Sequence, residues 1–202
     1  MSMPEEFMEM SRMSTAVISD SLSRMGLKHQ TLHSAIKPLS PDMRLSGPAA
    51  TAECYPGGTH GTEKLIEKLK PGEIAVLDGK GFSEAVLWGE IFTLMAMVRK
   101  AGGAVIDGAV RDVQDIKELG FPMFSRHVTP ACGTGDKLGR VNVTVSCGGV
   151  AVNPGDYVFG DALGVVIVPR EEIKNTRGMC LEVIRKEKEL IGKLKKELGL
   201  GG

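Results

Sequence analysis

An arginine and an aspartate stand side by side at positions 111 and 112, after an apolar segment and at the start of an expected short helix. The first backbone N–H groups of a helix have no partner within it, so this position suits an anion or a metal-bound ligand. A carboxylate is an oxygen ligand that Mg²⁺ accepts, and an arginine stabilises negative charge that develops on a substrate oxygen. Arg111 and Asp112 are therefore the first candidate site.

The local sequence also leaves a structural interpretation open. Asp112 could be the N-cap of the following helix with Asp115 as its acidic partner, an arrangement that contributes about 1 kcal/mol. Asp107 is expected to order the turn after the preceding strand, and Asp115 to cap the helix or orient the arginine. Arg126 and His127 follow in a later expected strand and could approach the same pocket.

The segments before and around the pair alternate between strand and helix patterns. A glycine at 89 would interrupt the helical stretch expected over 84–101. In chain order, we expect a helix over 14–26, a strand over 49–54, a helix over 62–69, a strand over 73–78, a turn over 79–81, a helical stretch over 84–101, a strand over 104–107, a tight turn at Gly108 and a helix over 112–119.

From Pro122 onward the pattern changes to short strands, and a mixed-charge helix over 171–198 ends the chain. The apolar stripe of this helix could pack on the body or on another subunit. Helices placed early and late around a β-rich middle predict an α/β (α+β) domain of layered sheets with flanking helices, not a barrel of eight βα units. We expect one domain over 1–202. The expected strands are 123–128, 141–146, 149–152, 156–160 and 164–169.

Composition excludes several classes of partner. Lys plus Arg number 25 and Asp plus Glu number 25, so no bulk positive field favours nucleic acid. The four cysteines are scattered, without zinc-ligand spacing, and are expected to be reduced and mostly buried. The N-terminus is not a signal peptide and no window approaches 18 apolar residues, so we expect a cytoplasmic protein that does not enter a membrane.

A longer motif surrounds the pair. Twenty residues separate Glu90 from Arg111, within W-G-E-I-F and G-G-A-V-I-D-G-A-V-R-D. This pattern resembles the RraA-like family, and within it the class II 4-hydroxy-4-methyl-2-oxoglutarate aldolases, which carry an acidic residue, twenty positions and then Arg-Asp. The resemblance extends from I-S-D-S-L-S-R-M-G-L near Ile18 to G-D-A-L-G-V-V-I-V-P-R at Gly160 and covers most of the chain.

The resemblance implies a swivelling β/β/α fold, a metal-dependent lyase, and homotrimers or homohexamers whose sites lie between subunits. Carried over by position, Asp112 matches the magnesium-anchoring aspartate and Arg111 the arginine that contacts the substrate. Glu90 matches the acidic residue of the motif. The substrate carboxylate would be held by the backbone of Gly89, Glu90, Ile91 and Phe92.

The chemistry of these residue types agrees with that assignment. Mg²⁺, or Mn²⁺ or another divalent cation, needs only one or two carboxylates when waters and substrate oxygens complete its shell, so Asp112 suffices. We expect retro-aldol cleavage of a 4-hydroxy-2-oxo acid to pyruvate, with oxaloacetate decarboxylation through the same enolate. Glu90 is the candidate base for the C4 hydroxyl, and the glycine at 89 would let the backbone approach the carboxylate closely.

Two other functions remain open. The RraA branch is described as inhibiting an RNA-degrading endonuclease by binding it, and a shared fold does not separate an enzyme from such a regulator. The aspartate at 112 favours the enzyme, because the inhibitor branch tends to replace it. A lyase for a different keto acid, with the metal site kept and the outer pocket changed, is the third interpretation.

Overall fold

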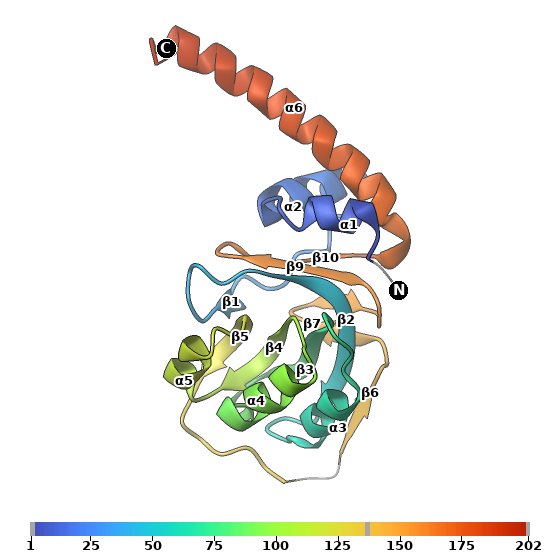
Figure 1. Cartoon of the computed structure of the whole chain (residues 1–202), viewed down its shortest axis with the longest axis vertical. Coiled ribbons are helices and arrows are strands. Elements are labelled where there is room, and N and C mark those ends of the chain that lie inside the picture. The colour runs from blue at the N-terminus through green and yellow to red at the C-terminus, as the bar shows by residue number, and fades with distance from the viewer. Residues whose placement is uncertain (1–2, 136–137, 201–202) are drawn as a thin grey trace.

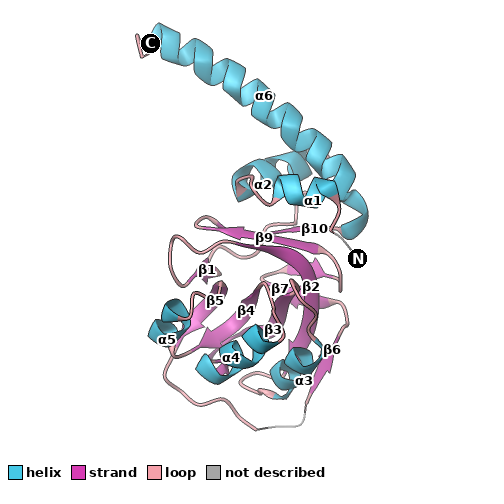
Figure 2. Cartoon of the chain, viewed as in Figure 1, coloured by secondary structure: helices cyan, strands magenta, loops and turns pink. Residues whose placement is uncertain are grey.

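The computed structural model describes residues 3–135 and 138–200. An eight-stranded sheet has the order β1–β5–β4–β3–β2–β9–β10, with β6 paired to β2, and β7 and β8 form a separate hairpin (Figure 2). Strands β2 to β5 are parallel, whereas β1, β9, β10 and β6 run antiparallel to their neighbours. The layered α/β fold with flanking helices is therefore confirmed.

The elements have the following bounds. The strands are β1 Lys37–Pro38, β2 Leu45–Cys54, β3 Ile74–Trp88, β4 Gly103–Val110, β5 Met123–Val128, β6 Gly139–Val141, β7 Val145–Cys147, β8 Val150–Val152, β9 Tyr157–Asp161 and β10 Gly164–Val168. The helices are α1 Glu5–Met10, α2 Thr15–Arg24, α3 His60–Lys68, α4 Glu90–Val98, α5 Val113–Glu118, the 3₁₀ turn η1 Arg170–Glu172 and α6 Ile173–Glu197.

The helix expected over 84–101 is wrong in its first part. Residues 84–88 continue β3, and the helix begins only at Glu90, directly after the glycine expected to interrupt it. Ala85 to Trp88 are all buried, as in a strand covered on both faces, and such a run lacks the alternation that identifies a half-exposed strand. Residues 79–81 lie at a register shift, where Asp78 pairs with Asp107 and Phe82 pairs with Gly108.

The tight turn expected at Gly108 is also wrong, because β4 continues to Val110. A Cβ at Gly108 would lie 2.9 Å from Leu87 Cδ1, so the glycine allows β3 and β4 to pack closely and does not form a turn. The segment 141–146, expected as one strand, is divided between β6 and β7, with Asn142 at φ +55° between them. Apart from the strand expected over 73–78, which continues to Trp88 as β3, every other expected helix and strand is present with ends shifted by a few residues.

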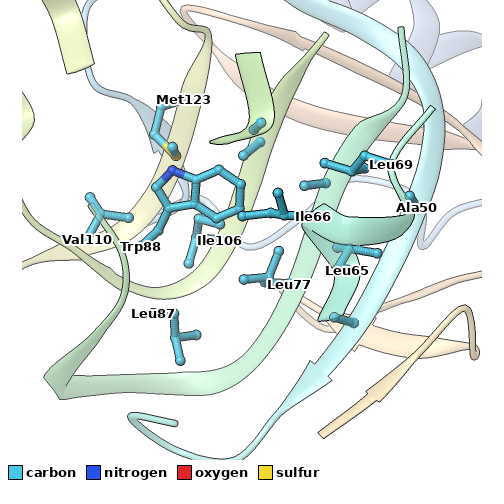
Figure 3. Close-up of a cluster of buried hydrophobic side chains, with 14 of the residues drawn as sticks. Ala50, Leu65, Ile66, Leu69, Leu77, Leu87, Trp88, Ile106, Val110 and Met123 are labelled. Carbon is cyan, nitrogen blue, oxygen red and sulfur yellow. The ribbon is translucent and has the colours of Figure 1, made fainter. Parts of the chain in front are cut away.

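Trp88 lies in the apolar core that α3, α4 and α5 form against one face of the parallel strands. Its indole packs among Ile106, Val110 and Met123 (Figure 3). The indole Nε1 donates to Thr93 Oγ1 at 2.9 Å, and Thr93 Oγ1 donates to the Gly89 carbonyl at 3.0 Å. This core therefore fixes the end of β3 and the first turn of α4 together.

The opposite face of the strands is covered by the β7–β8 hairpin, which two buried carboxylates hold in place. Asp107 Oδ2 accepts from the Gly148 N–H, and its Oδ1 pairs with Arg126 Nε at 2.5 Å. Its neighbour in the register, Asp78, accepts from the Ser146 N–H at 3.2 Å. Asp107 is thus buried in mid-strand and does not order a strand-end turn.

Helices α1, α2 and α6 pack on β9 and β10, on the side away from α3 to α5, and the far half of α6 extends beyond the body (Figure 1). Ile173, Cys180 and Val183 are buried, whereas Leu190 and Ile191 are at least half exposed. The apolar stripe expected on this helix therefore packs on the body along its first half only. In the part of the chain that the structure describes, no helix is long and apolar enough to span a membrane.

Candidate functional site

The two segments of the motif leave the sheet next to each other. Trp88 and Val110 are register partners at the ends of the parallel strands β3 and β4. The Arg111 N–H donates to the Trp88 carbonyl at 3.1 Å, so the pairing continues one residue beyond the strand. Because the carboxyl ends of parallel strands meet at one edge, Gly89 and Glu90 lie against Arg111 and Asp112.

Asp112 caps a helix other than its own. Its Oδ2 accepts a hydrogen bond of 3.0 Å from the backbone N–H of Glu90, the first residue of α4. Asp112 does occupy the N-cap position of α5, but its side chain makes no hydrogen bond there, and Asp115 is exposed. The capping box that the sequence left open between these two aspartates is therefore absent, and the side chain instead joins the two halves of the motif.

The backbone of Asp112 adopts the left-handed conformation, with φ +54° and ψ +39°. For a residue other than glycine this costs on the order of 1 kcal/mol, and such strain is concentrated at functional sites. The conformation directs the carboxylate toward α4, where the Arg111 Nε lies 3.4 Å from Oδ2.

Gly89 provides the space for this contact. Its φ of −153° is extended backbone that any residue can adopt, so conformation does not require a glycine. A Cβ at this position would lie 2.5 Å from Asp112 Oδ2 and 3.2 Å from Arg111 Cγ, inside normal contact distance. The glycine thus leaves room for the carboxylate and the guanidinium at the start of α4.

A cleft of about 320 Å³ opens at this point. Arg111 crosses it, donating from Nη1 to Cys132 Sγ at 3.3 Å. The hydrogen bond with Cys132 and the nearby Asp112 carboxylate raise the pKa of Arg111 above its ordinary value, so the guanidinium stays charged. The cleft is lined by Thr59, Glu63, Val86, Trp88, Gly89, Ile91, Phe92, Arg111, Asp112, Cys132 and Gly133.

The far wall of the cleft was not expected from the sequence. It combines the start of α3, with Thr59 and Glu63, and the segment containing Cys132 and Gly133. The two are joined by backbone hydrogen bonds, from the Thr59 N–H to the Thr134 carbonyl at 3.1 Å and from the Thr134 N–H to the Gly57 carbonyl at 2.7 Å. No local pattern links segments that lie more than seventy positions apart.

Of the expected site residues, Gly89, Ile91, Phe92, Arg111 and Asp112 all line the cleft, and Glu90 contributes its N–H to Asp112. Glu90 itself is not among the lining residues, whereas Glu63, which was not expected from the sequence, is one of them.

The other candidates from the sequence lie elsewhere. Arg126 forms its ion pair with Asp107 on the hairpin face of the sheet. His127, paired in register with Ala109, does not line the cleft, and neither does the exposed Asp115.

The donor set fits a hard divalent cation better than zinc. Within residues 3–135 and 138–200, no group of three or more His, Cys, Asp or Glu side chains is placed to hold a metal ion. Both contacts of Asp112 use Oδ2, which leaves Oδ1 without a hydrogen bond among the described residues. One carboxylate oxygen beside an open cleft matches the way Mg²⁺ binds, with water and ligand oxygens completing the octahedron.

The arrangement also suits a small carboxylate. The N–H groups of Ile91 and Phe92 belong to the first turn of α4, where no acceptor exists within the helix. Together with the Arg111 guanidinium they form a positively polarised end of the cleft. A 2-oxo acid there would have its carboxylate at the helix start and its keto oxygen toward Arg111 and Asp112.

Known proteins of one family are similar to this chain. A family model described as RraA-like, Aldolase/RraA, matches residues 15–167. A protein of Halalkalibacterium halodurans named "Putative 4-hydroxy-4-methyl-2-oxoglutarate aldolase" is 38% identical over 161 residues, which are 80% of this chain and 75% of that protein. Protein DlpA of Legionella pneumophila is 32% identical over 179 residues, 85% of this chain but 29% of DlpA, so the chain spans under a third of that relative.

Among solved structures, Streptomyces coelicolor RraAS2, described as an unusual member of the RNase ES inhibitor RraA protein family, superposes with a TM-score of 0.84. The superposition covers 96% of this chain and all of that one, at 24% identity. This likeness shows the fold alone.

Proposed function

This chain belongs to the RraA-like family, and from that premise and the cleft we propose that it is a divalent-metal-dependent carbon–carbon lyase. Its substrate would be a 4-hydroxy-2-oxo acid, the class that includes 4-hydroxy-4-methyl-2-oxoglutarate, and its product pyruvate. The observation that carries the proposal is Asp112, whose backbone conformation and hydrogen bond to α4 direct its carboxylate into a cleft shared with Arg111.

Each residue of the cleft has a chemical task in this proposal. The N–H groups of Ile91 and Phe92 bind the substrate carboxylate, and Asp112 provides the carboxylate ligand for Mg²⁺ or Mn²⁺. When bound, the cation supplies Lewis-acid polarisation of the keto group. Arg111 stabilises the negative charge on the enolate oxygen, which is the charge that develops as the C3–C4 bond breaks.

A base must remove the proton of the C4 hydroxyl. Glu90 is the acidic residue of the motif and remains our candidate, although its side chain is outside the lining of the cleft. The same enolate would form on loss of CO₂ from oxaloacetate, so we propose decarboxylation of oxaloacetate as a second activity of the same residues.

The surface beside the cleft supports self-association. On α4, the side chain of Ile91 is 69% exposed and that of Val98 is 82% exposed. Leu94, Met95 and Met97 on the same helix are also exposed, to a lesser degree. Contiguous apolar side chains on one helix mark an interaction surface. We propose a cytoplasmic homo-oligomer, a trimer or hexamer, whose interface lies next to the site, and light scattering after gel filtration would test it.

The alternative function is that of a regulatory protein that binds and inhibits a ribonuclease. The fold shared with RraAS2 is compatible with it. The cleft with Asp112 favours the enzyme, since a binding protein has no need for a strained carboxylate beside an arginine.

The deciding experiment measures pyruvate release with coupled lactate dehydrogenase. A panel of 4-hydroxy-2-oxo acids and oxaloacetate would be assayed with Mg²⁺, with Mn²⁺ and with EDTA. We expect metal-dependent pyruvate, abolished by EDTA and reduced about 100-fold in Arg111→Lys, because lysine cannot reproduce the planar guanidinium. No pyruvate from any compound, together with inhibition of a ribonuclease by the intact protein, would establish the alternative.

A further inference from the structure

A continuous series of hydrogen bonds runs from the apolar core to the carboxylate of Asp112. The indole Nε1 of Trp88 donates to Thr93 Oγ1 at 2.9 Å, and that hydroxyl donates its own proton to the Gly89 carbonyl at 3.0 Å. The peptide group that begins with this carbonyl ends in the N–H of Glu90, which donates to Asp112 Oδ2 at 3.0 Å. Each donor in the series therefore points toward Asp112.

The chemistry of the groups in the core determines this direction. An indole N–H can only donate, so the hydroxyl of Thr93 must accept from Trp88 and direct its one proton to the Gly89 carbonyl. Trp88 and Thr93 are both fully buried, and the indole is enclosed by the core side chains around it (Figure 3). Because a buried donor without a partner is costly, the indole holds the hydroxyl in this orientation.

The peptide group between Gly89 and Glu90 carries this orientation to the site. A peptide group is planar, so the direction of its carbonyl determines the direction of its N–H. The Gly89 carbonyl accepts from Thr93 twice, from the hydroxyl and from the backbone N–H at 3.1 Å. A carbonyl that accepts hydrogen bonds also polarises the N–H of its own peptide group, which strengthens the contact with the carboxylate.

Asp112 needs a constraint from outside its own side chain. The last torsion of an aspartate has broad preferences, so its rotamer does not set the plane of the carboxylate. Two groups contact Oδ2, the Glu90 N–H and the Arg111 Nε. The guanidinium belongs to a long side chain that is 37% exposed, whereas the N–H belongs to the backbone of α4. The N–H is therefore the contact that the fold itself holds in place.

We propose that Thr93 is a positioning residue for the divalent cation. Through the peptide group of Gly89 and Glu90 it holds Asp112 with Oδ2 engaged, so that Oδ1 is the oxygen available to the cation. This inference rests on the metal-dependent lyase proposed above and adds to it a residue that touches neither substrate nor cation. Removing a group that orients a metal ligand in this way typically weakens metal binding by about 10- to 100-fold.

A purely structural role for Thr93 leads to a different expectation. Threonine hydroxyls within helices often donate to the carbonyl four residues earlier, where they affect only the helix. In that case loss of the hydroxyl would lower stability and leave the affinity for a cation unchanged. Metal affinity therefore separates the two roles.

The test compares two substitutions of Thr93. Thr93→Val keeps the shape of the side chain and removes the hydroxyl, whereas Thr93→Ser keeps the hydroxyl. In calorimetric titrations with Mg²⁺, we expect Kd to rise by about tenfold or more in Thr93→Val and to stay within about threefold of the unmodified protein in Thr93→Ser.

Thr51→Val is the matched control. Thr51 is also fully buried, and its Oγ1 donates to the Val143 carbonyl at 2.5 Å, but neither residue lines the cleft. Loss of this hydrogen bond should lower the urea midpoint of unfolding and leave the Kd for Mg²⁺ within about twofold, because distant sites act independently.

The indole of Trp88 gives a second measurement, which depends neither on activity nor on a variant. Trp88 is the one tryptophan of the sequence, so the indole region of a ¹H–¹⁵N spectrum contains a single Nε1–H signal. A cation that withdraws electrons from Asp112 alters every hydrogen bond of the series, and the signal should shift as Mg²⁺ is added. The shift should persist in Thr93→Ser and be lost in Thr93→Val, where the indole has no hydroxyl acceptor.

The outcomes distinguish this inference from the proposed lyase. Weaker Mg²⁺ binding in Thr93→Val that is restored in Thr93→Ser supports it, even if no compound releases pyruvate. Unchanged affinity in Thr93→Val, or the same loss in Thr51→Val, overturns it and leaves the lyase intact. An indole signal that stays in place while calorimetry records Mg²⁺ binding to the unmodified protein also overturns it. Absence of Mg²⁺ binding to the unmodified protein would overturn both proposals.

Discussion

The backbone N–H of Glu90 donates to the carboxylate of Asp112, 22 positions away in sequence, at 3.0 Å. The strand residues that precede them, Trp88 and Val110, are register partners with the same separation of 22. The spacing of the motif therefore reflects the pairing of two parallel strands, and the hydrogen bond is the next contact beyond that pairing.

Two substitutions of Asp112 separate its two roles. Asp112→Ala removes the cap of α4 and is expected to lower the free energy of unfolding by about 1 kcal/mol, while Asp112→Asn keeps an oxygen acceptor and most of that stability. Both should reduce pyruvate release by about 100-fold or more, since neither supplies an anionic ligand. Urea unfolding and calorimetric titration with Mg²⁺ would measure the two effects. Pyruvate release that survives Asp112→Ala at saturating Mg²⁺ would contradict the proposed lyase.

Glu90 can be tested without disturbing the cap, because its contact with Asp112 uses the backbone N–H. Glu90→Gln should leave the unfolding free energy within about 0.5 kcal/mol of the unmodified protein. If the side chain is the base for the C4 hydroxyl, kcat should fall about 100-fold with little change in KM. An unchanged kcat in this variant would show that a group other than the Glu90 side chain is the base.

Gly89→Ala tests the space at the start of α4. The added methyl carbon would lie 2.5 Å from Asp112 Oδ2, so the carboxylate must move, and we expect at least a tenfold loss of activity. Gly192→Ala is the control, because nothing lies within 4 Å of a Cβ at this exposed position in α6. It should stabilise the helix by about 0.5–1 kcal/mol and leave catalysis unchanged. Equal activity of both variants would mean that the close contact at Gly89 is not needed.

The four thiols should differ in reactivity. Cys132 is exposed and contacts Arg111, whereas Cys54, Cys147 and Cys180 are buried. Burial and the nearby Asp107 and Asp78 carboxylates raise the pKa of Cys147, which keeps it protonated. Iodoacetamide should therefore modify the native protein at Cys132 alone and block the cleft, as mass spectrometry and the pyruvate assay would show. Cys132→Ser should resist this inactivation.

Because of Asp161, the free energy of unfolding should fall as the solution is made acidic. Burial raises its pKa, but hydrogen bonds from the Thr15 N–H and hydroxyl and from the Leu163 N–H outweigh burial and hold the pKa below its ordinary value. A lowered folded-state pKa gives stability that is present above the unfolded value of about 3.9 and is lost as pH falls through the folded value.

The corresponding variant is Asp161→Asn. It should lower the unfolding free energy by about 1 kcal/mol at pH 7 and reduce the loss between pH 5 and pH 2, as urea titrations at each pH would show. Asp20→Asn, at an exposed position on α2, serves as the control for removing one carboxylate. A variant whose pH profile matches that control would refute the role of Asp161.

The sequence was sufficient to predict most elements and the centre of the site. Alternation of apolar runs with glycine and proline turns indicated the layered α/β fold, and the motif identified Gly89, Arg111 and Asp112 as neighbours, which the structure brings together. The role of Asp112 was predicted only in part. Its position at a helix start was evident, but the helix that its side chain caps begins 22 residues earlier.

The errors have a common physical origin in long-range packing. Residues 84–88 were expected in a helix, because a strand buried on both faces has no alternation of apolar and polar side chains to identify it. Glu63 was not considered at all, since its place in the cleft depends on the contact of Thr59 with the segment that follows Cys132. Such contacts exist only after the chain has folded.

The pairing of Trp88 with Val110 has a consequence for insertions and deletions. Residues 99–102 connect α4 to β4 outside both the helix and the strands. An extra residue accommodated in that connection would lengthen the motif by one and leave the register of β3 against β4 unchanged. A residue added between Ala109 and Arg111 would instead move Arg111 and Asp112 relative to Gly89 and Glu90. Homologous chains with a different residue count between the acidic residue and Arg-Asp can therefore keep the same site, provided that the difference falls in this connection.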